Sequence, residues 1–244
     1  MIKRLIQSFI KARGYCLLPL DKYQSVLKFM KEDQRRKNLF NYLAFDLVLD
    51  VGAHKGGFCD KLFHFGYKGD VISFEPVKEN FEILKTRKYP FNSWEVYCFG
   101  LGSVSGKVDI NLSANTHSSS ILDMLDTHQL SAPDSLYIGS ELIQLRTIDE
   151  LFPENYFKDK KTLIKIDTQG FEKSVLSGAS KSILDVAAVQ LEVSLVPLYL
   201  GSWSFQEVLD YFQNLGFELW SIENGFFDKI TGRLLQVDAV FSRK

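Results

Sequence analysis

The chain of 244 residues is 45% hydrophobic and 24% charged, values that indicate a globular protein with a buried core and exclude a disordered or fibrous chain. Its 29 basic and 30 acidic residues leave a formal net charge of −1, which argues against binding nucleic acid through an overall basic excess. The balance is uneven: residues 1–45 hold ten Lys or Arg and three acids, a net of +7, which leaves −8 on the remainder.

Residues 1–45 therefore form a basic N-terminal extension to a domain at 46–244. Apolar residues recur with helical spacing in its first ten positions, which predicts a basic amphipathic helix. Such a helix could contact an anionic membrane surface peripherally, cover the domain as a lid, or join two copies in a homodimer. No apolar run reaches the roughly 18 residues of a membrane span. The three cysteines are too scattered for a disulfide framework, so we expect a cytoplasmic protein.

From Phe45 onward, short apolar runs alternate with amphipathic segments, a pattern that predicts a parallel sheet with helices on both faces. Strands are predicted at 46–51, 71–75, 95–99, 163–167, 186–193, 217–222 and 234–241, the last two antiparallel. Helices are predicted at 57–65, from Pro76 through Leu84, and at 205–215 before Gly216. Residues 106–146 interrupt this order and predict an inserted hairpin and loop.

The first strand runs into a glycine-rich turn, DVGAHKGGF, at residues 50–58. Gly52 and Gly56 let the backbone bend tightly beneath a ligand, and the next helix points its first amides at that ligand. His54 stands where a dinucleotide fingerprint needs its second glycine. Asp50 would repel a diphosphate but accept hydrogen bonds from a cationic ligand, which favours S-adenosylmethionine.

Glu75 closes the second strand, twenty-five residues after Asp50. An acid at this position can accept both ribose hydroxyls of an adenosine, as it does in dinucleotide-binding folds. The glycine turn alone could be an ordinary strand-to-helix connection. Together with Glu75 and the intervening helix, it predicts a nucleoside site.

The segments DVGAHKGGF, ISFEPVKENFEIL, FGLGS, HSSSIL, RTIDELF, IKIDTQGFEKSVLSGA and VDAVF resemble the FkbM-type methyltransferases over roughly residues 45–242. The resemblance implies an α/β class I (Rossmann-like) methyltransferase fold, a seven-stranded sheet with its last strand antiparallel. It also implies S-adenosylmethionine-dependent O-methylation, often of a saccharide hydroxyl in polysaccharide, glycolipid or natural-product pathways. His54 departs from the family, which usually has Asn there. The residues expected to contact the cofactor are Asp50, Gly52, Ala53, His54, Gly56, Glu75, Pro76, Gly100, Leu101, Ser119 and Asp167.

Acids follow the fourth and fifth predicted strands, on the edge where open α/β sheets bind ligands. Methyl transfer to a hydroxyl needs an oriented acceptor and a group that takes its proton, or a divalent metal that lowers the hydroxyl pKa. Asp167 and Glu192 are the catalytic candidates here. Asp167 could instead cap the next helix, Glu172 could be a first-turn acid favoured by the helix dipole, and Glu192 could simply face water.

His117 lies in the inserted loop and is the third catalytic candidate, because a neutral imidazole can act as a general base. A solvated loop histidine is the alternative. Ser118 to Ser120 could hold the substrate or the cofactor carboxylate, and Arg146 could bind that carboxylate or form a structural salt bridge. His128 is expected on a surface helix without a function.

The acceptor is expected to be a saccharide or another small molecule. No Asx-Pro-Pro-aromatic motif follows the fourth strand, which argues against a nucleic-acid base as acceptor. A lipid, peptide or polyketide acceptor is an open alternative. A nucleoside-binding protein without turnover is another.

Overall fold

The computed structural model describes residues 34–243, and the predicted amphipathic helix of the first ten residues lies outside this range. Residues 34–43 form a helix. The chain divides into two units at residues 39 and 40, and all the elements discussed below belong to residues 40–243.

The main sheet has seven strands in the order β3-β2-β1-β7-β8-β10-β9. Their bounds are β1 Leu47–Val51, β2 Asp70–Phe74, β3 Trp94–Tyr97, β7 Thr162–Ile166, β8 Ala188–Ser194, β9 Glu218–Asn224 and β10 Gln236–Ser242. Strands β3, β2, β1, β7 and β8 pair in parallel, and β10 pairs antiparallel with both β8 and β9. The predicted class I sheet with its reversed last strand is confirmed.

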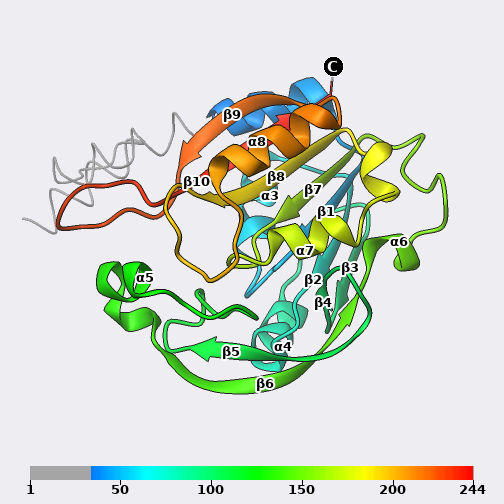
Figure 1. The fold of residues 1–244 in the computed structure, drawn as a ribbon. Coiled ribbons are helices and arrows are strands. Elements are labelled where there is room, and N and C mark those ends of the chain that lie inside the picture. The colour runs from blue at the N-terminus through cyan, green and yellow to red at the C-terminus, as the bar shows by residue number, and fades with distance from the viewer. Residues whose placement is uncertain (1–33, 244) are drawn as a thin grey trace, which may run out of the picture. The chain divides into compact units, whose positions relative to one another are not determined.

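Helices cover both faces of this sheet, as Figure 1 shows. Their bounds are α3 Gly57–Phe65, α4 Lys78–Thr86, α7 Glu172–Ser177 and α8 Phe205–Asn214. Side chains alternate along β1, so Leu47 and Leu49 join the core beneath α7 and α8, whereas Val48 packs against α3. With both faces covered, β1 and β7 are buried along their whole length.

The predicted insertion is a second, three-stranded sheet in the order β4-β6-β5. It consists of β4 Gly100–Leu101, β5 Gly106–Ser113 and β6 Tyr137–Arg146, and β5 and β6 form the predicted antiparallel hairpin. We call β5 and β6 the β5–β6 arm; it curves beneath the main sheet in Figure 1. Ile110 and Ile143 of the arm pack with Val77, next to the end of β2. The short helices α5 Asp126–Ser131, α6 Ile148–Leu151, η1 Pro133–Ser135 and η2 Ser182–Leu184 complete the chain.

Two local predictions are wrong. Helix α4 begins at Lys78 rather than at Pro76, because the Val77 amide donates to the Glu75 carboxylate and is not part of the helix. His128 is buried rather than on the surface, and its ring lies 5.1 Å from that of Tyr199 and 5.4 Å from that of Phe226. Helix α5 folds back onto the loop after β8, a long-range contact with no local sequence signal.

Gly178 lies at the end of α7, where the helix packs closely against the loop after β4. A substitution of Gly178 tests this packing. A Cβ added there would lie 1.9 Å from the Gly102 carbonyl oxygen, whereas a Cβ at Gly139 in β6 meets nothing within 4 Å. We expect Gly178→Ala to lower the free energy of unfolding by about 2 kcal/mol or more. Gly139→Ala should raise it by roughly 0.5 kcal/mol. Urea unfolding measures both, and equal midpoints would contradict this packing.

Candidate functional site

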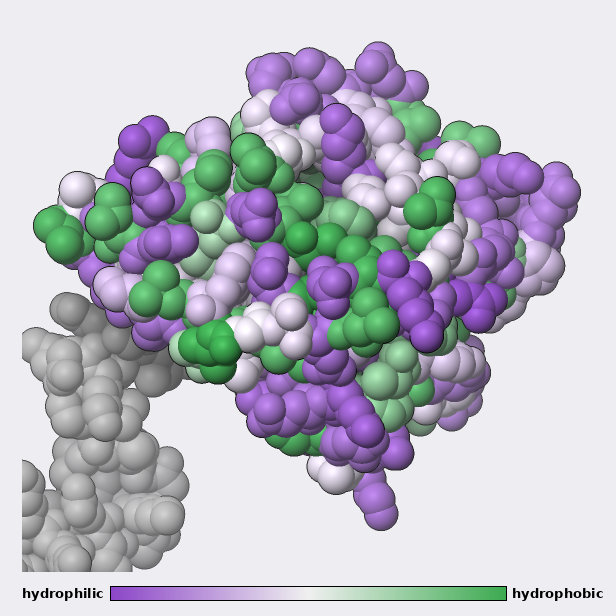
Figure 2. All heavy atoms as spheres, turned by 60° about the horizontal axis from the view of Figure 1, so that its bottom comes forward, coloured by the Kyte–Doolittle hydropathy of each residue, from purple (hydrophilic) through white to green (hydrophobic). Residues whose placement is uncertain are grey.

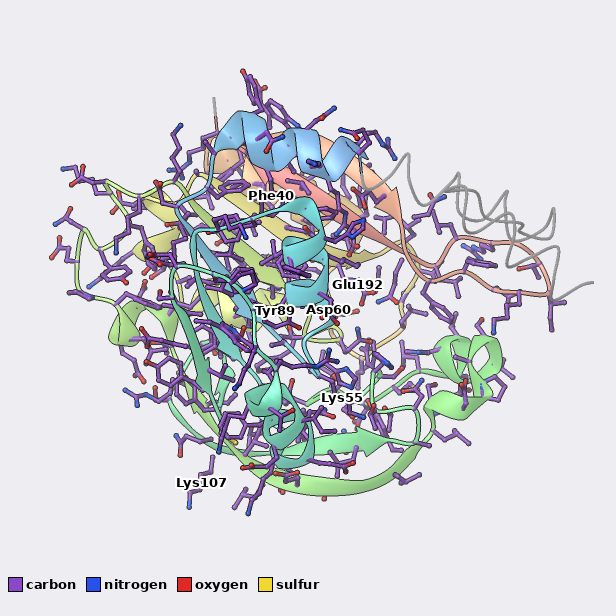
Figure 3. All side chains as sticks on the ribbon, turned by 180° about the vertical axis from the view of Figure 1, so that it is seen from behind. Phe40, Lys55, Asp60, Tyr89, Lys107 and Glu192 are labelled. Atoms are coloured by element: carbon purple, nitrogen blue, oxygen red, sulfur yellow. The ribbon has the colours of Figure 1, made fainter. Side chains whose placement is uncertain are left out.

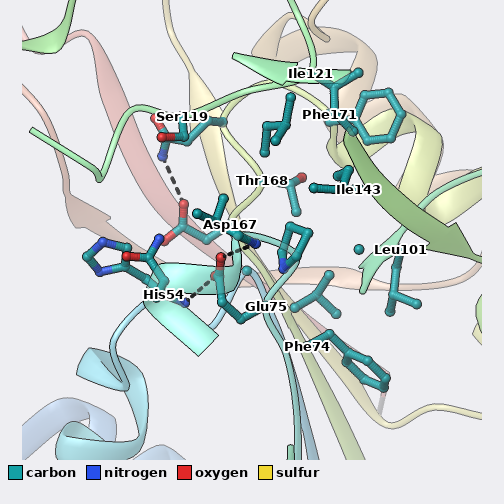
Figure 4. Close-up of a pocket in the computed structure, with 18 of the residues that line it drawn as sticks. His54, Phe74, Glu75, Leu101, Ser119, Ile121, Ile143, Asp167, Thr168 and Phe171 are labelled. Carbon is teal, nitrogen blue, oxygen red and sulfur yellow. Dashed lines mark hydrogen bonds between the residues drawn. The ribbon is translucent and has the colours of Figure 1, made fainter. Parts of the chain in front are cut away.

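A pocket lies between the carboxyl ends of β1, β2, β7 and β8 and the β5–β6 arm. In Figure 3, Lys55, from the turn after β1, lies between the sheet and the arm, and Glu192 belongs to β8 of the sheet. One wall is polar and consists of His54, Glu75, Asn80, Thr116, His117, Ser119, Asp167, Thr168, Gln169 and Glu192. The other is apolar and consists of Val51, Phe74, Pro76, Val77, Leu101, Ile110, Ile121, Ile143, Leu145 and Phe171. Figure 4 shows these two sides.

Most of the predicted site residues come together in this pocket. The residues expected to contact the cofactor that line it are Gly52, His54, Glu75, Pro76, Gly100, Leu101, Ser119 and Asp167. All three catalytic candidates, Asp167, His117 and Glu192, line it too. Asp50, Ala53 and Gly56 do not line it.

Gly52 begins the glycine turn in a left-handed conformation, with φ of +75°. The amides of Gly52 and Ala53 both donate to the Phe74 carbonyl oxygen at 3.0 Å. A Cβ at Gly52 would lie 1.9 Å from the Asp167 carbonyl oxygen. This close approach, and not only the turn, requires glycine, and it brings the ends of β1, β2 and β7 to one point.

Asp50 lies beneath the glycine turn rather than in the pocket. It is fully buried and pairs with Lys165, the residue beside it in β7, with 3.1 Å between the carboxylate and Nζ. Lys165 also donates to the carbonyl oxygens of Gly52 at 2.9 Å and Val51 at 3.4 Å. Burial raises the pKa of Asp50, against the opposing effect of Lys165. The cation that Asp50 contacts is therefore a side chain of the protein and not the cationic ligand that its sequence position suggested.

Lys165 is a site residue that the sequence analysis missed. Burial lowers its pKa, but the carboxylates of Asp50 and Asp167 outweigh burial and raise it above its usual value, so the ammonium stays charged. Its Nζ lies 3.6 Å from the Asp167 carboxylate. A lysine in the middle of the apolar run LIKI was the available signal, because a buried charge in a strand needs a partner on the next strand.

Glu75 is buried at the end of β2, with one oxygen accepting from the His54 amide at 2.7 Å and the other from the Val77 amide at 2.9 Å. Figure 4 shows the bond to His54. Each oxygen keeps a lone pair for a ligand hydroxyl. Burial raises the pKa of Glu75 to about 7, against the lowering effect of the two amides.

Asp167 and Glu192 are bridged by the side-chain amide of Gln169, which donates to Asp167 at 2.9 Å and to Glu192 at 2.8 Å. The Tyr199 hydroxyl donates to the Gln169 side-chain oxygen at 2.7 Å and so sets the amide's orientation. The Gln236 amide donates to the same Glu192 oxygen at 2.8 Å. Burial, with Asp167 and Asp238 nearby, raises the pKa of Glu192 well above its usual value.

The structure distinguishes the alternatives that the sequence left open for Asp167, Glu172 and Arg146. Asp167 caps no helix, because α7 begins at Glu172 and its N-cap is Phe171. Glu172 is a structural acid: it is buried and accepts from the amides of Thr168 at 3.0 Å and Gly170 at 3.1 Å. Arg146, the last residue of β6, forms a salt bridge with Glu150 of α6.

The rings of His54 and His117 lie against each other on the polar wall of the pocket, with centroids 4.2 Å apart. His54 Nε2 lies 2.9 Å from the Thr116 hydroxyl. Burial, with His117 and Lys55 nearby, lowers the pKa of His54 to about 4, so this ring is neutral at physiological pH. His117 itself is exposed and joins the inserted loop to the glycine turn.

The described residues offer no ligand set for the divalent metal considered above. Among residues 34–243, no group of three or more His, Cys, Asp or Glu side chains could hold a metal ion. The Gln169 amide takes the position between the two carboxylates that bridging a metal would require. Nor does any helix in this range have the length and apolar character needed to cross a membrane.

A sheet of this strand order, with a glycine turn after β1 and an acid after β2, is typical of the class I S-adenosylmethionine-dependent methyltransferase fold. The family model for the methyltransferase FkbM domain matches residues 50–219, more than half of the chain. The chain therefore belongs to the FkbM methyltransferase family, and the resemblance found in its motifs is confirmed.

Solved methyltransferase structures are similar at low identity. A TehB-like S-adenosylmethionine-dependent methyltransferase from Corynebacterium glutamicum is 14% identical over 93% of this chain and 100% of its own, with a TM-score of 0.41. Magnesium protoporphyrin IX methyltransferase from Synechocystis, with bound S-adenosylmethionine, is 9% identical over 99% and 97%, with a TM-score of 0.45. No curated protein matches the chain.

Lys165→Met tests the buried ion pair. It leaves the Asp50 carboxylate buried without a partner, so we expect a loss of about 3–5 kcal/mol in the free energy of unfolding. The double variant Asp50→Leu/Lys165→Met should recover most of that loss, since no uncompensated charge remains. Lys161→Met, at an exposed position just before β7, is the control. Urea unfolding measures these free energies. If Lys165→Met loses no more free energy of unfolding than Lys161→Met, the ion pair does not support the fold.

The raised pKa of Glu75 predicts that the affinity for the cofactor depends on pH. Because its pKa is about 7, the carboxyl is mostly protonated at pH 6 and mostly ionised at pH 8, and only the ionised form can accept from two amides and two hydroxyls. Calorimetry should show up to about tenfold tighter binding of S-adenosylmethionine at pH 8 than at pH 6. Glu75→Gln should bind about tenfold more weakly at pH 8 and lose the pH dependence. Glu79→Gln, on the exposed side of α4, should behave as wild type.

Proposed function

We propose that this methyltransferase transfers the methyl group of S-adenosylmethionine to a hydroxyl of a saccharide. The observation that carries the proposal is the pair of carboxylates, Asp167 and Glu192, joined by the Gln169 amide on the polar wall of the pocket. Carboxylates and amides in a fixed array are the groups that bind neighbouring hydroxyls, because each hydroxyl both donates and accepts. The FkbM family membership is consistent with such an acceptor.

The pocket fits the cofactor at its opposite end. Glu75 offers two lone pairs to the ribose hydroxyls, and the apolar wall of Leu101, Ile143 and Leu145 offers a dry surface to the adenine. When bound, S-adenosylmethionine supplies an electrophilic methyl group on a sulfonium. Asp167 lines the same pocket, with 40% of its side chain exposed.

We assign to Glu192 the role of general base, which takes the proton from the acceptor hydroxyl. Its raised pKa makes the ionised carboxylate a stronger base than an ordinary glutamate, which suits a general base working near neutral pH. Asp167 orients the acceptor, because Lys165 and Gln169 hold its carboxylate in place. His117, exposed on the same wall, is the alternative base.

The first test of the function is a panel of mono- and oligosaccharides incubated with S-adenosylmethionine. We expect a mass gain of one methyl group, located on a hydroxyl by fragmentation. Methylation of a lipid, peptide or polyketide alone would replace the saccharide assignment. Cofactor binding without methylation of any acceptor would support the silent nucleoside-binding protein instead. A cytoplasmic location belongs to this proposal, supported by the unpaired Cys59 and Cys98.

Glu192→Gln tests the assigned base. We expect kcat to fall by about a hundredfold or more, while the affinity for S-adenosylmethionine changes less than about twofold. The wild-type rate should rise with pH through a raised pKa, and the variant should lose this rise. Glu79→Gln serves again as the surface control. If His117→Gln removes the pH-dependent rise and Glu192→Gln keeps it, the imidazole is the base.

A further inference from the structure

The turn between β9 and β10, residues 225–235, carries apolar side chains that face water. Ile230 is 91% exposed and Phe227 is 51% exposed, although most large apolar residues of the sheet are buried. The basic residues Lys229 and Arg233 flank Ile230, and both are exposed. Figure 2 shows apolar side chains among hydrophilic ones on the side where this turn lies. We call residues 225–235 the β9–β10 hairpin loop.

Hydrogen bonds within the loop hold Ile230 in its exposed position. The Asp228 carboxylate accepts from the amide of Ile230 at 3.0 Å and from the amide and hydroxyl of Thr231 at 2.6 and 2.7 Å. The Asp228 amide donates to the Arg233 carbonyl oxygen at 2.8 Å, and Gly232 closes the turn with φ of +72°. Ile230 therefore stands at the end of an ordered turn, and folding back to bury it would break these bonds.

The hairpin loop is hydrogen-bonded to helix α5, which packs against Tyr199 beside the pocket. The Ser131 hydroxyl at the end of α5 donates to the Asp228 carboxylate at 2.9 Å, and the neighbouring Leu130 is 78% exposed. The His128 ring of α5 packs against Tyr199, whose hydroxyl orients Gln169. Exposed apolar side chains thus lie on two connected elements, and α5 is linked to the pocket through Tyr199 and Gln169.

We propose that the β9–β10 hairpin loop docks this protein on an anionic lipid surface. An exposed apolar residue between two cations matches the interface of such a membrane, where Ile230 enters the acyl boundary and the cations meet the headgroups. Within residues 34–243, neither Lys229 nor Arg233 has an ion-pair partner, so both charges are available. Asp228 is the single acid of the loop. Its carboxylate accepts hydrogen bonds from the amides of Ile230 and Thr231 and from the Ser131 hydroxyl.

Co-sedimentation of the full chain with vesicles tests this docking. We expect binding to vesicles of equimolar phosphatidylcholine and phosphatidylglycerol, weaker binding at higher salt, and little binding to phosphatidylcholine alone. Ile230→Asp should lower the partition coefficient about tenfold or more. Lys229→Ala and Arg233→Ala should each lower it about fivefold. Leu184→Asp, at another apolar position that is 55% exposed, should leave it unchanged.

A second readout separates insertion from a folding defect or a protein contact. Tryptophan fluorescence of Ile230→Trp should be quenched by brominated lipids, and all variants should keep the wild-type affinity for S-adenosylmethionine. The proposal is overturned if the wild type does not bind anionic vesicles, or if Ile230→Asp binds them equally. It is also overturned if lipid-free wild type sediments as a dimer and Ile230→Asp as a monomer, because the loop would then join two copies.

Discussion

The buried ion pair between Asp50 and Lys165 is the interaction on which the arrangement of the site depends. These residues are register partners on β1 and β7, and both lie where neighbouring strands exclude water. A pair of this kind contributes little net stability, but losing one partner is strongly destabilising. Lys165 directs its remaining hydrogen bonds to the carbonyl oxygens of Val51 and Gly52. The ion pair therefore anchors the start of the glycine turn to the strand that carries Asp167.

Burial raises the pKa values of the acids around the pocket, and the Lys165 cation opposes part of this rise. Burial raises the pKa values of Glu75 and Glu172 to about 7. Burial, together with the neighbouring carboxylates of Asp167 and Asp238, raises the pKa of Glu192 well above its usual value. Lys165 counters part of this effect at Glu75 and Glu192. Without that charge the carboxyl edge of the sheet would hold several uncompensated acids. The acidic excess of the main domain, visible in composition, is thus concentrated in part around a fixed internal cation.

The sequence predicted the parts of the structure that depend on local patterns. Helix α3 begins and ends where expected, because Gly56 and Gly66 bound a regular apolar spacing. The seven-stranded sheet with its antiparallel last strand, the hairpin insertion and the positions of Glu75, Asp167 and Glu192 on one edge also follow from pattern and resemblance. The role of Lys165 was missed although its place in the apolar run LIKI signals a buried charge, and the roles of Gln169 and Tyr199 could not be predicted in this way. Each depends on a partner from another element, and no spacing in the sequence reports those contacts.

The backbone around the pocket shows why these long-range contacts matter. His54, Thr116 and Gln169 all have positive φ without being glycine, a conformation that costs about 1–3 kcal/mol each, and all three line the pocket. They come from the glycine turn, the inserted loop and the turn after β7.

The bonds that hold these conformations are also the bonds that form the site. The His54 amide donates to Glu75, and the His54 ring meets the Thr116 hydroxyl. The Gln169 side chain is held by Asp167, Glu192 and Tyr199. Backbone strain at the pocket is therefore stabilised by the same carboxylates that we assign to the cofactor and the acceptor. A substitution that removes one of them should disturb the backbone as well as the chemistry, which is why amide replacements that keep the side-chain shape are the informative variants.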